Sequence, residues 1–153
     1  MAKVYYDDER NVGIGWNLTT LYKYKSKFEY YGELDNLETL QPEDDAATTN
    51  WGTEWHTPTK EEINELIENC IYSDTIINGV SGAKYTASNG NSIFMPAGGY
   101  YFDTSNLNNN SNIYWSSSLN DEYDHLAYAF YGENLSPLKR CFGCLVRPVR
   151  SKK

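Results

Sequence analysis

The stretch IYWSSSLNDEYDHLAYAFYGENLSPLKRCFGCLVRPV, residues 113–149, decides the fold expected for this chain. Apolar and aromatic residues alternate in it with the period of a half-buried strand, so it predicts three or four short strands joined by polar loops. One side of its middle strand would carry Leu126, Tyr128 and Phe130, and the other Ala127, Ala129 and Tyr131. The second side, beside the loop 120–125, has the character of a contact surface rather than of a catalytic cleft.

Length and charge bound the class of protein. The chain has 153 residues, enough for a single domain over 1–153. Its formal net charge of −8 disfavours nucleic acid and anionic membranes as partners. No apolar run is long enough to span a membrane, and the first residues have no signal-peptide pattern. The 14 tyrosines suit either strand faces or a recognition surface.

Three cysteines, Cys70, Cys141 and Cys144, are an odd number and do not form a disulfide framework. Cys141 and Cys144 make one C-x-x-C pair, but a zinc site needs a second pair or two histidines. The only histidines are His56 and His125, so neither a metal nor another cofactor is expected. A bridge between Cys70 and Cys141 stays open.

Two helices are predicted ahead of the strands. Pro42 at a first helical position and Gly52 after the end indicate a short helix between them. Thr59 and Glu62 form a capping-box pattern, which predicts a second helix from 60 to about 70. Its apolar stripe, at helical spacing, consists of Ile63, Leu66, Ile67 and Cys70.

A hairpin is predicted over 83–94, because Asn89-Gly90 separates two strand-like runs and both turn positions favour positive φ. Residues 76–80 suggest a short strand, and the Asn-rich residues 103–112 predict a surface loop. Two helices followed by many short strands indicate an α+β domain with a mostly antiparallel sheet.

Several blocks stand in the order found in a known family. They are EDDAA at 43–47, NWG at 50–52, GVSG at 79–82, NGNSIFMPAGGY at 89–100, YWSSS at 114–118 and VRPV at 146–149. Over residues 40–150 the chain resembles the C-type-lectin-like domains of the Bacteroidetes major-paralogous-domain type, which are related to the variable proteins of diversity-generating retroelements. Residues 1–40 depart from that family.

The resemblance implies a C-type lectin-like fold, with two helices flanking a small sheet, and a ligand surface on the segment 113–149. In the retroelement proteins that segment is diversified by mutation at adenines. The candidate ligand-binding residues, whose types such mutation permits, are Asp121, Tyr123, Asp124, His125, Ala127, Ala129, Tyr131, Leu138, Cys141 and Phe142.

The function expected is a ligand-binding module, on a cell surface or a virion such as a phage, that recognises a protein or a glycan. One alternative is calcium-dependent carbohydrate binding through oxygens of the loop 120–124. Another is a structural tip or fibre subunit. An enzyme is not expected, because neither histidine has a Ser or Cys partner with an orienting acid in a recognisable motif. His56 is interpreted as a residue that hydrogen-bonds locally.

Overall fold

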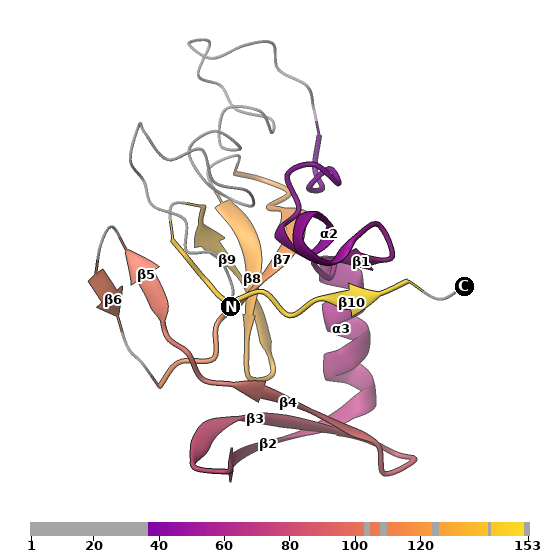
Figure 1. Ribbon diagram of the computed structural model, residues 1–153, viewed down its shortest axis with the longest axis vertical. Helices are drawn as coiled ribbons and strands as arrows, with labels where there is room; N and C mark the ends of the chain where they lie inside the picture. The colour runs from indigo at the N-terminus through magenta and orange to yellow at the C-terminus, as the bar shows by residue number, and fades with distance from the viewer. Residues whose placement is uncertain (1–36, 103–104, 108–109, 124–125, 141, 152–153) are drawn as a thin grey trace.

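Short strands dominate the structure, a computed structural model that describes residues 37–102, 105–107, 110–123, 126–140 and 142–151 (Figure 1). The elements are α2 (Ala46–Trp51), β1 (Trp55–His56), α3 (Lys60–Asn69), β2 (Cys70–Ile77), β3 (Val80–Ala87), β4 (Ser92–Pro96), β5 (Tyr100–Phe102), β6 (Ser105–Leu107), β7 (Tyr114–Leu119), β8 (Leu126–Tyr131), β9 (Asn134–Lys139) and β10 (Val149–Arg150).

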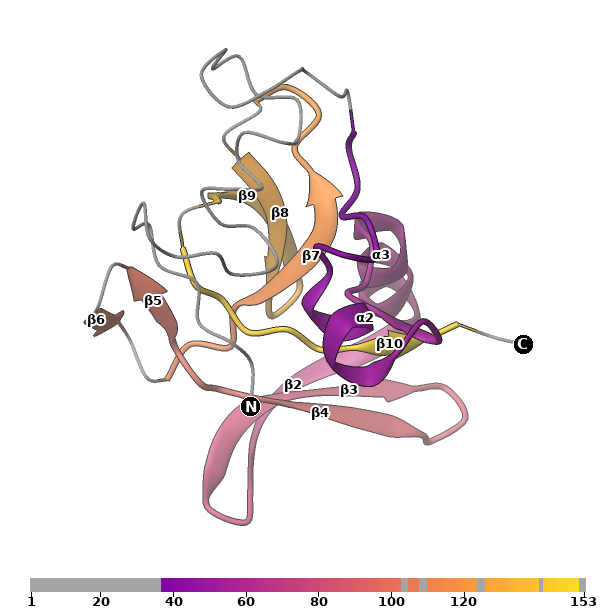
Figure 2. The ribbon, with the colours of Figure 1, turned by 45° about the horizontal axis from the view of Figure 1, so that its top comes forward.

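The strands form four antiparallel sheets, β2–β3–β4, β7–β8–β9, β5–β6 and β1–β10. Figures 1 and 2 show β2–β3–β4 below β7–β8–β9, with α2 and α3 on one side and β5–β6 on the other. The β1–β10 pair joins the first described strand to the last through Trp55↔Arg150 and His56↔Val149.

The predicted α+β architecture, a C-type lectin-like fold with two helices flanking one small sheet, is wrong. The structure is 46% strand and 15% helix, and its strands are divided among small sheets. The described helices are only six and ten residues long. Tight turns explain the difference, because they let consecutive strands pair with each other in β2–β3–β4 and in β7–β8–β9.

Helix α3 confirms the capping-box prediction. The Thr59 side chain accepts from the Glu62 N–H, and the Glu62 carboxylate accepts from the Thr59 N–H. Ile63 is buried, and Leu66, Ile67 and Cys70 pack against the same cluster. The predicted stripe is therefore the face that α3 presents to the core.

The first predicted helix begins later than expected. Residues 42–44 form a turn, and Asp45 is the N-cap of α2, its side chain accepting from the Ala47 N–H. The first N–H groups of a helix have no carbonyl partner within the helix, and the Asp45 carboxylate accepts from one of them. Pro42 has no side-chain acceptor for this role, so the helix begins after Asp45.

The β2–β3 hairpin, which was not predicted from the sequence, has a two-residue turn. Asn78 and Gly79 both have positive φ, 51° and 80°, and connect Ile77 directly to Val80. This is the conformation that Asn-Gly favours in a two-residue turn. The residues 76–80 are thus the end of a hairpin and not a separate short strand.

The predicted hairpin over 83–94 is confirmed as β3–β4, but with a longer loop. Of its two turn residues, only Gly90 has positive φ, 86°. The Asn89 side chain instead accepts from the Asn91 N–H, a turn that an asparagine makes with its own side chain.

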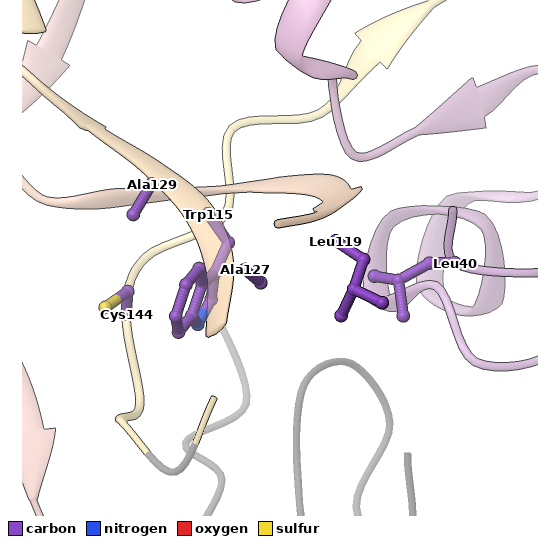
Figure 3. Close-up of a cluster of buried hydrophobic side chains, with 6 residues drawn as sticks. All are labelled: Leu40, Trp115, Leu119, Ala127, Ala129 and Cys144. Carbon is purple, nitrogen blue, oxygen red and sulfur yellow. The ribbon is translucent and has the colours of Figure 1, made fainter. Parts of the chain in front are cut away.

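In the β7–β8–β9 sheet, β7 and most of β8 are covered on both faces, whereas β9 is largely exposed. On one face Trp115 packs with Leu119, Ala127, Ala129 and Cys144, as Figure 3 shows together with Leu40. On the other, Tyr114 and Phe130 pack with residues of α3 and of the β2–β3–β4 sheet. All of β7 is buried, so this strand forms the centre of the described molecule.

Two tyrosine hydroxyls form hydrogen bonds between the β2–β3–β4 and β7–β8–β9 sheets. Tyr85 Oη donates to the Gly132 carbonyl at 2.6 Å, and Tyr114 Oη donates to the Pro96 carbonyl at 2.6 Å. Burial raises the pKa of both phenols, that of Tyr114 to about 12. A hydrogen bond to Asp74, followed by burial, raises the pKa of Tyr72 to about 12.

These pKa shifts predict a loss of stability at alkaline pH. The folded state favours the neutral phenols, so their contribution is complete below pH 10 and is lost as the pH rises to about 12. Denaturant unfolding at a series of pH values measures this, and Tyr114→Phe should flatten part of the decline. A free energy of unfolding that stays constant from pH 9 to pH 12 would contradict the assignment.

Candidate functional site

Residues 120–123, the described start of the connection between β7 and β8, are held by Asn120. Its side-chain oxygen accepts from the N–H groups of Glu122 and Tyr123, at 3.1 and 2.9 Å. The Leu126 N–H donates to the Tyr123 carbonyl at 3.1 Å. Asn120 is therefore a structural residue, and its oxygen does not serve as one of the proposed calcium ligands. Tyr123, by contrast, is 54% exposed.

Beside this loop, three side chains form a polar cluster at the surface, which we call the Lys60 cluster: Lys60, Asp121 and Tyr128. Lys60 Nζ donates to Asp121 Oδ1 at 2.6 Å, and Tyr128 Oη donates to Asp121 Oδ2 at 2.9 Å. The Lys60 ammonium lies 5.2 Å from the centre of the Tyr128 ring. The hydrogen bond from Asp121 raises the pKa of Lys60, which thus carries its charge throughout the physiological range.

Asp121 and Tyr123 are the candidate residues that the structure places together at this end of β8. Leu138, opposite Ala127, and Phe142, after the end of β9, belong to the same end of the sheet. Both are half-buried, however, and Phe142 packs against Tyr100 with ring centres 5.6 Å apart. The candidates Asp124, His125 and Cys141 lie outside the described residues.

Two candidates are wrongly placed. Ala127 and Ala129 are buried against Trp115 rather than exposed, so neither can contact a ligand. The alternation of side chains along β8 was predicted correctly. The face with Ala127 and Ala129 was expected to be exposed, but it packs in the core cluster around Trp115. Small residues there leave room for the indole of Trp115.

Tyr131 is 51% exposed but lies at the opposite end of β8 from Tyr123. The expected single surface shared by the two tyrosines is therefore not formed. Tyr131 borders a hollow of about 360 Å³ between the β2–β3 hairpin, the residues 110–112 and the β8–β9 turn. Its polar lining comprises Asp74, Thr75, Ser81, Asn110, Asn112 and Tyr131.

This hollow could not be predicted from the sequence, because its walls come from three distant segments. The Asn-rich segment 103–112, predicted as a surface loop, was the one available signal, but the structure places the short strand β6 in it and buries Ser111 and Asn112. A second hollow of about 310 Å³ lies between α3 and β4 and is mostly apolar, with Leu66, Ile93 and Met95 in its wall.

His56 confirms its interpretation as a locally bonded residue, since its Nε2 lies 2.9 Å from Glu62 Oε2. Cys70 and Cys144 are free thiols, so the bridge from Cys70 is not formed. Burial raises the pKa of the Cys144 thiol. Among the described residues no group of His, Cys, Asp and Glu side chains has the arrangement of a metal site. Nor does any described helix have the length and apolar character that crossing a membrane requires.

Comparisons with known proteins do not extend this description. No family model matches the chain, and no match was found among curated proteins or solved structures.

Proposed function

We propose that this chain is a binding module that recognises a protein on a cell surface through the β7–β8 loop and the Lys60 cluster. The observation that carries the proposal is the half-exposed ring of Tyr123 on a loop that Asn120 fixes from within. Tyrosine is among the residues that contribute most to binding energy at protein interfaces. A fixed loop adds to affinity, because little conformational entropy is lost on binding.

The charged groups of Lys60 and Asp121, beside Tyr123, would orient a bound protein partner. Lys60 and Asp121 are held by each other and by Tyr128, so a partner meets one defined arrangement of charges. Neither Asp121 nor Tyr123 lines the hollow beside Tyr131 or the apolar one beside α3. A broad surface of this kind suits a protein ligand better than a small molecule.

Replacing Tyr123 by alanine is expected to weaken binding to target cells at least about tenfold, the loss typical of an aromatic anchor. The free energy of unfolding should change by no more than about 0.5 kcal/mol, because the side chain is half-exposed. Flow cytometry of the fluorescently labelled chain on a panel of bacterial cells measures the first quantity, and urea unfolding the second.

Ile71→Ala is the matched control, since Ile71 is an exposed large side chain on β2, outside the proposed surface. It should bind as the unaltered chain does. Protease treatment of the cells should remove the binding that Tyr123→Ala weakens, whereas a loss of that same binding on periodate oxidation alone would indicate a glycan and contradict the proposal. Equal binding by Tyr123→Ala and the unaltered chain, or binding to none of the cells, would also contradict it.

A further inference from the structure

The hollow beside Tyr131 is built by segments that hold one another in place. Tyr85 Oη donates to the Gly132 carbonyl, and Gly132 adopts a positive φ of 58° in the β8–β9 turn. Within β2, Tyr72 Oη donates to the carboxyl of Asp74, which lines the hollow. The β8–β9 turn is thus tied to β3 before any ligand arrives, which lowers the entropic cost of binding.

Asn112 is the feature that points to a ligand. It is only 6% exposed and lines the hollow, yet its side chain takes part in no hydrogen bond with any part of the chain that the structure describes. The amide atoms of Asn112 are not fully enclosed, so water in the hollow can bond them when no ligand is present. An amide offers two donors and one acceptor, so a bound molecule with hydroxyl groups would satisfy it.

The remaining lining defines the chemistry of that molecule. Asp74 supplies carboxyl oxygens, Thr75 and Ser81 supply hydroxyls, and Asn110 supplies a second amide. Among the residues that the structure describes, no Lys or Arg lines the hollow, and the chain has a net charge of −8, so an anionic ligand is disfavoured. Tyr131 adds an aromatic ring at the edge, against which an apolar face of a ligand can lie.

We propose that this hollow binds one neutral hexose unit of a glycan. A hexose carries hydroxyls that both donate and accept around its rim and C–H groups on its faces, which match the polar walls and the Tyr131 ring. The volume of about 360 Å³ is near the lower end of the range for ligand sites, which suits a single sugar unit rather than a chain. This site lies at the other end of β8 from the surface around Tyr123 and stands independently of it.

The test is a titration of the full chain with methyl glucoside, methyl galactoside and methyl mannoside, followed by the shifts of backbone amide resonances. At least one hexoside should shift the amides of Asn112, Tyr131 and their neighbours, with a dissociation constant in the millimolar range that a few hydrogen bonds and one ring contact provide. Tyr131→Ala and Asn112→Ala should each weaken binding at least about tenfold, and Tyr123→Ala should leave it unchanged.

Asn112→Leu separates binding from folding. Leucine has nearly the shape of asparagine but no polar atoms, so it removes the unpartnered amide. We expect this variant to unfold at the same or a higher urea concentration than the unaltered chain while it loses hexoside binding. No shifts with any of the three hexosides at tens of millimolar, or shifts that survive in Tyr131→Ala and Asn112→Leu, would overturn the proposal. The proposal would also be overturned if a simple amine, and none of the sugars, shifted the backbone amide resonances of Asn112 and Tyr131.

Discussion

Replacing Trp115 by alanine is expected to lower the free energy of unfolding by about 3–5 kcal/mol. The side chain is 2% exposed and packs against Ala127, Ala129 and Cys144 in the cluster of Figure 3. Its neighbours include small residues on a strand that is hydrogen-bonded on both sides, so they cannot move in to fill the space. A domain of this size has only about 5–15 kcal/mol in total, which makes the loss a large share of its stability.

Urea unfolding followed by circular dichroism measures this loss, and the chain supplies a matched control. Trp51, the last residue of α2, is 50% exposed, so Trp51→Ala should change the free energy of unfolding by no more than about 0.5 kcal/mol. Trp115→Phe should cost less than Trp115→Ala, because it keeps an aromatic ring and removes an indole N–H that has no partner among the described residues. Equal losses for Trp115→Ala and Trp51→Ala would mean that Trp115 is not the centre of the core.

Local signals in the sequence were sufficient for helix α3. Its capping box spans four residues and its apolar stripe repeats within one helix, so no distant part of the chain is needed to recognise them. The preference of Asn-Gly for two-residue hairpin turns is equally local. It could also have predicted the β2–β3 hairpin, which was missed. Asn78-Gly79 is the same dipeptide as Asn89-Gly90, but the run before it was assigned to the end of a helix and to a short strand.

The error at Ala127 and Ala129 has a different origin. Alternation along a strand separates its two faces but does not say which face meets solvent. In β8 both faces are covered, one by Trp115 and the other by Tyr114. Only the register of β7 against β8, which places Trp115 opposite Ala129, shows why a small residue is needed there. The hollow beside Tyr131 depends in the same way on contacts between distant segments, so sequence patterns could identify Tyr131 but not Asn112 or Asp74.

Replacing Asp45 by alanine is the second change for which we expect a large effect, about 3 kcal/mol. Asp45 is buried, and its carboxylate connects two segments. It accepts hydrogen bonds from α2 and from Thr57, the residue after β1. Oδ1 accepts from the Ala47 N–H at 2.8 Å and from Thr57 Oγ1 at 2.6 Å, and Oδ2 accepts from the Thr57 N–H at 2.8 Å. Alanine removes the helix cap and also leaves the buried Thr57 N–H without an acceptor.

A second N-cap in the same chain tests whether this contact, rather than capping alone, accounts for the loss. Thr59 caps α3 through a local bond of 3.3 Å to the Glu62 N–H, so Thr59→Ala should cost only about 1 kcal/mol. Asp45→Asn should fall between the two alanine variants, because the carboxamide keeps one acceptor but turns a donor toward N–H groups. Since α2 holds β1 through Thr57, and β1 pairs with β10, Asp45→Ala should also speed hydrogen exchange at the β1–β10 pair while α3 stays protected. A loss for Thr59→Ala as large as that for Asp45→Ala would reduce Asp45 to an ordinary helix cap.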